Sequence, residues 1–312
     1  MQMRFKAHQS FFVRKGWISK GLKAVLEDGS ILMPSSSKKA MDELGLGANQ
    51  VVALRYWLQA MGLITSKVGR RREHVPTKLG EIILRQDPYT EETGTLFAIQ
   101  CNLASAREDA AAWYFFFNEF RMNVFRREDF TRALERYIFT YNDRKDVALA
   151  SLESDFNCIV GTYVSHDHTS SKAISPESVI DCPLGELGLI DVESRADRTY
   201  RKTPPNINAL PAILVLYAIC SMQEHLAGEG QPVQDEVPLE ALLNGPCSPG
   251  RVFNLDSVGL LDKLYELQNS DYLRINRTAG LDVVHILADG LAKEECLRRY
   301  YELMGQEGRN ES

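Results

Sequence analysis

The segment from residue 48 to residue 61 carries side chains that could recognise DNA bases. Asn49, Tyr56 and Gln59 fall on one side of a predicted helix, opposite its apolar face. Asparagine and glutamine side chains can bond to base edges in a major groove. Arg55 lies at the flank of this side, where a guanidinium can pair with a phosphate. The pattern predicts a recognition helix, although an ordinary amphipathic core helix has similar apolar spacing.

A basic hairpin is predicted directly after this helix. Residues 62–66 and 73–76 have the length and composition of two short strands. Arginines at the tip of such a hairpin can neutralise phosphates or enter a minor groove. A solvated turn could carry the same residues, so the prediction of a DNA-binding wing depends on its place after the helix. The tip contains three consecutive arginines, namely Arg70, Arg71 and Arg72.

The elements that must position these side chains come before them. Residues 17–26 form an apolar helical stripe, and a second, shorter stripe follows a run of serines and extends to Leu44. Gly45-Leu46-Gly47 is then the turn into the third helix, because glycine permits a positive φ. This order, followed by a basic hairpin, is that of a winged helix-turn-helix. We predict this fold for residues 1–86, where it could also serve protein contacts alone.

Positive charge is concentrated in the same segment. The whole chain has a net charge of −6, but residues 1–85 contain 15 lysines and arginines and 6 acidic residues, a net charge of +9. The rest of the chain has a net charge of −15. Chance clustering on solvated faces is one explanation. The asymmetry is also typical of a polyanion-binding module joined to an acidic body, and it predicts double-stranded DNA as a partner.

Composition places the chain among ordinary globular proteins. Of its 312 residues, 44% are hydrophobic and 25% are charged. The longest apolar run, residues 209–220, is too short to cross a membrane, and the first residues lack a signal-peptide core. We therefore predict a cytoplasmic protein without a membrane partner. The six scattered cysteines are expected to be free thiols and not zinc ligands.

Helical spacing of apolar residues continues beyond the first module. It runs through much of residues 87–200, with a linker expected at residues 195–205. Residues 201–312 repeat the order of helices followed by a hairpin. We therefore expect a mainly α fold with a winged helix-turn-helix in residues 1–86, a helical middle region, and a second winged-helix-like domain at the C-terminal end.

Many short motifs of this chain match one bacterial family. They are Phe5–Trp17 with Lys20-Gly21, Leu44–Val51, Arg55–Leu58, Gly62–Ile64, Asp87–Tyr89, Gly94–Leu96, Ala112–Tyr114 with Phe117-Asn118, Asp155–Cys158 and Thr162-Tyr163. The chain resembles a family classed as a domain of unknown function, whose best-known members are the SspB proteins of the DNA phosphorothioation defence system. The resemblance covers nearly the whole chain. Where that family usually has Ser-Pro-Leu, this chain has Cys182-Pro183-Leu184.

The resemblance implies a role in the sulfur modification of DNA and in anti-phage defence. It implies that the protein is an endonuclease that nicks one DNA strand, so that sulfur can replace a non-bridging phosphate oxygen. It also implies three partners, namely a cysteine desulfurase, an ATPase and an ATP-pyrophosphatase-like sulfurtransferase.

Strand nicking would need an activated nucleophile and stabilisation of the charge that develops on the phosphate. His8 could act as a general base and Arg14 could clamp a phosphate. Lys15 and Lys20 would be further DNA contacts. Alternatively, these side chains fasten the N-terminal arm to the fold.

Asp155 and Tyr163 are a second candidate pair, since residues eight apart on a predicted helix share a face. Asp155 could hold a divalent metal such as Mg or Mn, or it could be a buried acid in an ion pair. The sequence shows neither the carboxylate cluster of two-metal nucleases nor a phosphate-binding loop. Two functions therefore stay open: a strand-nicking endonuclease, and a non-catalytic DNA-binding adaptor or transcriptional regulator.

Overall fold

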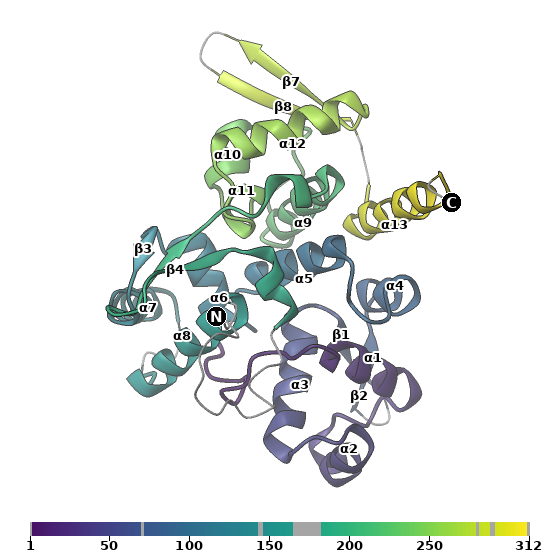
Figure 1. The fold of residues 1–312 in the computed structure, drawn as a ribbon, viewed down its shortest axis with the longest axis vertical. Coiled ribbons are helices and arrows are strands. Elements are labelled where there is room, and N and C mark those ends of the chain that lie inside the picture. Colours follow the sequence, from purple (N-terminus) through teal and green to yellow (C-terminus); the bar gives the residue numbers. More distant parts are fainter. Residues whose placement is uncertain are drawn as a thin grey trace.

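The computed structural model is mainly α-helical, which confirms the prediction of a mainly α fold. Figure 1 shows the N-terminal helices at the bottom, the C-terminal helices at the top, and the middle part between them. No helix of the described chain is both long and apolar enough to cross a membrane. The structure describes residues 2–69, 72–142, 146–164, 182–278, 281–287 and 291–310.

The N-terminal part contains three helices, a hairpin and a fourth helix. Its elements are α1 (Trp17–Glu27), η1 (Pro34–Ser36), α2 (Ser37–Leu44), α3 (Ala48–Ala60), β1 (Ile64–Val68), β2 (Arg72–Pro76) and α4 (Lys78–Gln86). Helix α3 packs on both α1 and α2, and its apolar side chains Val51, Leu54 and Leu58 are buried as the spacing predicts. Strands β1 and β2 pair antiparallel, with Val68 opposite Arg72 at the tip. This is the order of elements expected for residues 1–86.

The middle part is helical, but it also contains a small sheet. Its elements are α5 (Thr93–Ser105), α6 (Ala111–Tyr114), η2 (Phe115–Glu119), β3 (Val124–Phe125), α7 (Arg127–Tyr141), α8 (Leu149–Tyr163), η4 (Pro183–Leu187), β4 (Ile190–Ser194), β5 (Thr199–Lys202) and η5 (Ile207–Ala209). The three strands lie in the order β3-β5-β4 and are antiparallel. The prediction of a linker at residues 195–205 is therefore wrong, because this segment includes β5. Charged residues obscure the strand alternation there, and a bulge separates Val192 from Ser194.

The aromatic segment of the middle part is less regular than its spacing predicts. Aromatic residues at helical spacing over residues 107–120 predict one α-helix with a buried face, but α6 begins at Ala111 and continues into η2, which is a π-helix. The side chains of Phe115, Phe116 and Phe117 are all buried. π-helical turns are rare and occur frequently at functional sites.

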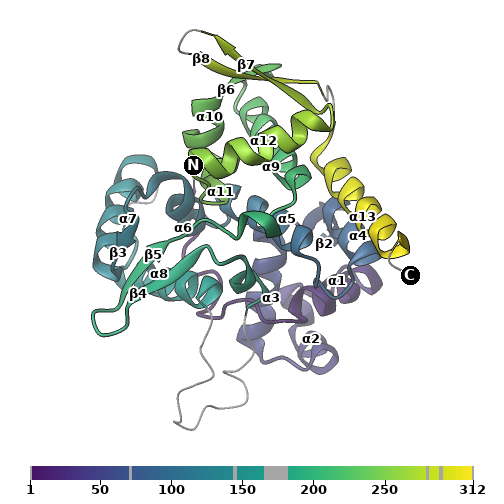
Figure 2. The same ribbon diagram turned by 45° about the horizontal axis from the view of Figure 1, so that its top comes forward.

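The C-terminal part repeats the helix and hairpin order with one additional strand. Its elements are α9 (Ala212–Gly228), β6 (Glu236–Pro238), α10 (Leu239–Asn244), α11 (Pro249–Val252), α12 (Ser257–Asn269), β7 (Leu273–Thr278), β8 (Leu281–Ile286) and α13 (Lys293–Asn310). The strands form a sheet in the order β6-β8-β7. Helix α13 leaves this part and packs on α4, α5 and α9, and Figures 1 and 2 both show it beside α4. Gly94 allows this approach, because a Cβ there would lie 2.4 Å from the Tyr300 ring.

A continuous cluster of buried apolar side chains connects the three parts. Trp57 of α3 and Trp113 of α6 pack edge to face, with ring centroids 5.2 Å apart. Phe97 of α5 and Phe253 after α11 are related in the same way, also at 5.2 Å. The domain boundaries proposed at residues 86 and 200 remain predictions.

The N-terminal arm, residues 2–16, crosses from the middle part to α1. The backbone N–H of Met3 donates to Asn142 Oδ1 at the end of α7, 2.9 Å away. The N–H of Lys6 donates to Asp155 Oδ1 on α8 at 2.9 Å, and Phe11 O accepts from Trp57 Nε1 on α3, also at 2.9 Å. The arm is therefore bonded to two parts of the fold.

Candidate nucleic-acid interface

Three of the four predicted DNA contacts on α3 reach the protein surface. Asn49 is exposed at the start of the helix, and Arg55 and Gln59 are half-buried farther along it. The Arg55 guanidinium donates to Leu32 O at 3.3 Å, which holds the head group close to the loop before α2. The surface available on α3 is therefore a narrow strip.

Tyr56 does not belong to this strip, and its prediction as a DNA contact is wrong. The residue is only 4% exposed, and its ring packs against Trp57 with centroids 5.2 Å apart. Burial raises the pKa of its phenol well above the usual value. The physical reason is that α3 is covered on more than one side, by α1 and α2 and by the N-terminal arm.

The hairpin after α3 presents some of the predicted basic side chains. Arg72 begins β2 and is exposed, and it has no carboxylate partner in the described part of the chain. Lys67 on β1 is also exposed and lies opposite Glu73 in the strand register. Arg70 and Arg71 lie outside the described residues.

The predicted contacts at the start of α1 differ in exposure. Lys15 and Lys20 are exposed, whereas Arg14 is half-buried with its guanidinium 5.8 Å from the Trp17 ring centroid. Gly16 lies between the arm and the helix with φ of +83°, a conformation that favours glycine. This turn places Lys15 at the surface immediately before the first turn of α1.

His8 and Asp155, which we predicted separately, form one buried pair. His8 is 0% exposed and Asp155 is 1% exposed, and the distance from Nε2 to Oδ1 is 2.7 Å. The backbone N–H of Ser10 donates to His8 Nδ1 at 3.0 Å. Because Nδ1 accepts this bond, the hydrogen that lies between the two side chains is on Nε2, which donates to Asp155 Oδ1.

This arrangement contradicts the role of His8 as a general base at a bound phosphate. The imidazole has no exposed surface, and its lone pair on Nδ1 is already used by Ser10. The Trp57 and Trp113 rings enclose it, with centroids 6.3 and 5.8 Å from the imidazole. The pair instead joins the N-terminal arm to α8, which was the alternative interpretation.

Asp155 also lacks the surroundings of a metal ligand. Its burial raises the pKa of the carboxyl group, while the bonds from His8 and Lys6 act in the opposite direction. Its Oδ2 is buried and has no hydrogen-bond partner among the described residues. Mg²⁺ requires six oxygen ligands and usually retains several waters. Aromatic rings surround the site, and the described chain contains no group of three potential ligands, so Mg or Mn does not fit here.

Tyr163 is separate from Asp155 in its bonding, although both are buried on α8. Its hydroxyl donates to Gln100 Oε1 on α5 at 2.5 Å, and Gln100 Nε2 donates to Val252 O at 2.9 Å. Burial raises the pKa of the Tyr163 phenol well above its usual value. The two residues therefore do not form the predicted catalytic pair, and Tyr163 links α8 to α5.

A basic cavity that includes Lys202 and Arg121 was not predicted from the sequence. Lys202 lies in the segment expected to be a linker, and its ammonium group bonds to Phe116 O and Phe120 O. These carbonyls are 86 and 82 residues away along the chain, so no local pattern connects them. The negative net charge of the chain after residue 85 also conceals the positive charge around this cavity.

Comparison with known proteins agrees with the predicted resemblance. Two solved structures of SspB match this chain with a TM-score of 0.77 and 24% sequence identity. One, described as magnesium ion-bound, is matched over 98% of this chain and 95% of its own, and the other over 98% and 96%. At this identity the likeness concerns the fold. Among curated proteins, none matches the chain.

A family model covers almost the same extent. The model described as a protein of unknown function, DUF4007, matches residues 5–301. The match includes the N-terminal arm from Phe5 onward, the middle part with α8, and the first half of α13. This chain therefore belongs to the DUF4007 family.

Proposed function

We propose that this protein binds double-stranded DNA through its N-terminal part and acts as an SspB-like component of a DNA phosphorothioation system. The fold shared with SspB over 98% of the chain supports the place in that system. The role would require the sulfur-transfer partners named above, namely a cysteine desulfurase, an ATPase and an ATP-pyrophosphatase-like sulfurtransferase.

The observation that carries DNA binding is a set of exposed cations without carboxylate partners. Phosphate contacts by lysine and arginine supply most of the non-specific affinity for DNA. The arm, α1, α2 and the hairpin all contribute to this set, so it is distributed over the predicted winged helix. None of its members has an ion pair within the described ranges. The set comprises Lys15, Lys20, Lys38, Lys67 and Arg72.

The geometry favours a DNA-binding adaptor over a strand-nicking endonuclease. Hydrolysis of a phosphodiester requires a base, nucleophile or metal within reach of the phosphorus. His8, Asp155 and Tyr163 are all buried and bonded to other parts of the protein. Nicking is the second candidate, and the magnesium in one SspB structure supports it.

Salt dependence of DNA binding tests the interface. The full chain is titrated into a fluorescent duplex between 50 and 200 mM salt, a range over which a protein that neutralises about 6–10 phosphates changes its affinity by roughly 10³–10⁵. Lys15→Gln with Lys20→Gln should lower the slope of log K against log salt by about 2 in magnitude, because each neutralised phosphate accounts for about 0.9 of that slope. The control is Arg274→Gln with Arg277→Gln on β7, which removes the same charge. Equal reductions in both variants would place the interface outside the N-terminal part.

A plasmid assay separates the two candidate functions. The protein is incubated with supercoiled plasmid and Mg or Mn, and open-circle DNA is measured with and without chelator. We expect intact plasmid. Metal-dependent conversion to open circle that co-purifies with the protein would establish the endonuclease and overturn the adaptor.

A further inference from the structure

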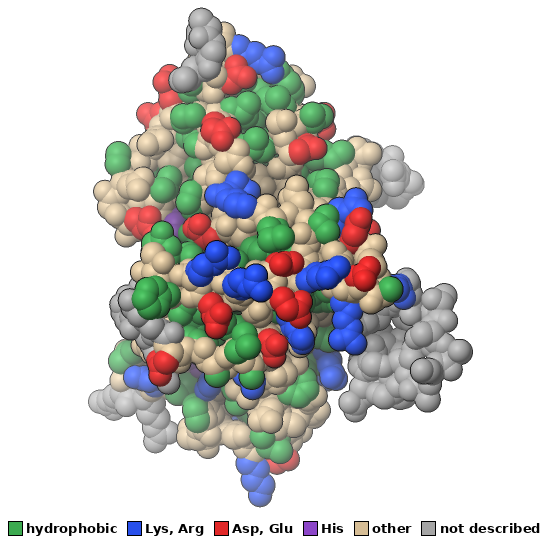
Figure 3. All heavy atoms as spheres, turned by 90° about the vertical axis from the view of Figure 1, so that its left-hand side faces the viewer, with side chains coloured by type: hydrophobic (Ala, Val, Ile, Leu, Met, Phe, Trp, Pro, Cys, Tyr) green, Lys and Arg blue, Asp and Glu red, His purple; other side chains and the backbone are tan. Residues whose placement is uncertain are grey.

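A second basic site lies where the middle part meets the C-terminal part. It is a cavity of about 280 Å³, lined by residues from η2 and the loop after it, from the end of β5, from the end of α10 and from residues 250–256. None of its lining residues comes from the N-terminal part. Figure 3 shows lysine and arginine side chains in a band across the middle of the face that includes α7 and β4, with acidic side chains among them. The site is therefore independent of the DNA-binding surface proposed above.

The charged groups of the cavity are unbalanced. Arg121, Lys202 and Arg251 line it, and Asp256 is the acidic residue beside them. The Asp256 carboxylate keeps its negative charge, but its Oδ1 accepts from Gly259 N at 2.8 Å and caps α12. None of the three cations forms an ion pair with a described carboxylate. With three cations against one carboxylate, the excess of positive charge favours an anionic ligand.

Lys202 is held at the wall by the π-helix. Its Nζ donates to Phe116 O at 2.5 Å and to Phe120 O at 2.6 Å. An ammonium group has three N–H donors, so the two carbonyls leave one of them, and Nζ also lies 4.4 Å from the Phe116 ring centroid. Burial, and to a lesser extent the charge of Arg121, lower the pKa of Lys202 to about 7. An anion bound in the cavity would raise the pKa of Lys202 again, because it favours the charged ammonium form.

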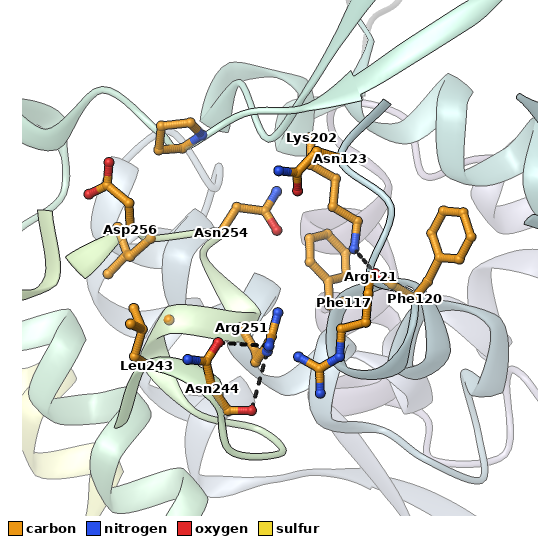
Figure 4. Close-up of a pocket in the computed structure, with 13 residues that line it drawn as sticks. Phe117, Phe120, Arg121, Asn123, Lys202, Leu243, Asn244, Arg251, Asn254 and Asp256 are labelled. Atoms are coloured by element: carbon orange, nitrogen blue, oxygen red, sulfur yellow. Dashed lines mark hydrogen bonds between the residues drawn. The ribbon is translucent and has the colours of Figure 1, made fainter. Parts of the chain in front are cut away.

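Two further side chains of the wall, Arg251 and Asn254, are also fixed in position. Arg251 donates to Asn244 Oδ1 at 2.7 Å and to Asn244 O at 3.3 Å, which holds its guanidinium toward the cavity. Asn254 donates to Leu189 O at 2.9 Å and ties this wall to the start of β4. Figure 4 shows Arg121 and Arg251 pointing toward one space, with Lys202 entering from the opposite side. Donors held in this way bind a ligand with little loss of side-chain entropy.

We propose that this cavity binds a phosphate group. With Lys202 protonated, the three cations and the Asp256 carboxylate give the cavity a net charge of +2, which balances a phosphate dianion, and arginine presents paired donors to its oxygens. At about 30 Å³ for each water, the cavity holds roughly nine waters, so a phosphate fits with an attached sugar. The phosphate can belong to a free nucleotide or to a DNA backbone, because both ligands would present a phosphate group to the same three cations.

Calorimetry on the full chain tests the site with three probes. These are inorganic phosphate, deoxyadenosine monophosphate and a 12-base-pair duplex. At pH 8 Lys202 is mostly neutral, so binding should take up close to one proton, which is measured by comparing buffers of different ionisation enthalpy. Arg121→Gln should weaken binding of the small anions about tenfold, as expected for loss of a charge-assisted hydrogen bond. Arg121 is exposed and its side chain bonds to no described group, so this variant should fold normally.

The matched control is Arg274→Gln, which removes the same charge outside the cavity. It should leave affinity unchanged, and Lys202→Met should abolish the proton uptake. Binding of the small anions assigns the site to a nucleotide. If only the duplex binds, and Arg121→Gln weakens it even when Lys15→Gln and Lys20→Gln are present, the source is DNA. Absence of binding by all three probes, or equal affinity in wild type and Arg121→Gln, overturns the proposal.

Discussion

Replacing His8 by alanine should destabilise the protein strongly while leaving the DNA-binding surface in place. The substitution removes a bond of 2.7 Å between two side chains that are at most 2% exposed. Removing the imidazole takes a donor from the buried Asp155 carboxyl group, and a buried acceptor that loses its partner costs about 1–3 kcal/mol, or more when it is charged. The Lys6 N–H still donates to Asp155 at 2.9 Å. We therefore expect a loss of about 3 kcal/mol in the free energy of unfolding.

A double-mutant cycle isolates the pair from other effects of the substitution. Asp155→Asn keeps the shape of the side chain but removes its charge, and it should cost about 1 kcal/mol. Combined with His8→Ala, it should cost less than the sum, with a coupling of about 2 kcal/mol. Urea unfolding followed by tryptophan fluorescence measures each value, since Trp57 and Trp113 lie beside the imidazole.

A surface histidine provides the control for this experiment. His225 lies 3.6 Å from Glu229 in a more exposed pair, and its replacement by alanine should cost about 1 kcal/mol or less. The reasoning is refuted if His8→Ala costs no more than His225→Ala. It is also refuted if His8→Ala remains fully folded and loses a DNA-cleavage activity that the wild type possesses.

Three further predictions follow from buried groups. In a titration of a fluorescent DNA duplex, Tyr56→Phe should leave the affinity unchanged, whereas Asn49→Ala should weaken it several-fold. If Tyr56→Phe weakens binding and Asn49→Ala does not, Tyr56 belongs to the interface. Tyr163→Phe should lower the free energy of unfolding in urea by about 1 kcal/mol without changing DNA affinity, because only the bond to Gln100 is removed. The pKa of Lys202 is about 7 in the folded protein and 10.5 when the side chain is in water. Between pH 7 and pH 10.5 the unfolded chain therefore binds more protons than the folded chain. Stability should therefore rise with pH in that window by up to about 1.4 kcal/mol per unit, and an unchanged slope in Lys202→Met would show that another group is responsible.

Local periodicity predicted the helices of the N-terminal part well, but it could not predict how many sides of α3 are covered. The apolar face that contains Leu54 is buried, as expected. Tyr56 lies on the other side, and it is covered because the arm returns to α3 and bonds to Trp57. That contact depends on tertiary packing, which one helical wheel does not contain. The strip that includes Asn49 was therefore predicted wider than it is.

The sequence also allowed candidate residues to be selected, but it did not allow the contacts between them to be predicted. Sequence analysis named both His8 and Asp155, but they are 147 residues apart, and nothing in their spacing indicates a contact. The hairpin of β4 and β5 was missed because its strands are short and rich in charged residues. Lys202 was missed with it, since its position depends on a π-helix that apolar spacing does not distinguish from an α-helix.

The attachment of the N-terminal arm to α8 has a consequence for synthesis on the ribosome. The arm emerges first, but Asp155, which fixes His8, is translated 147 residues later. At about 5–20 residues per second, this delay is roughly 7–30 s. During that time the histidine, the aromatic side chains of the arm and Trp57 have no completed binding site. The first helices can form early, whereas the assembly of this core must wait until α8 has left the ribosome.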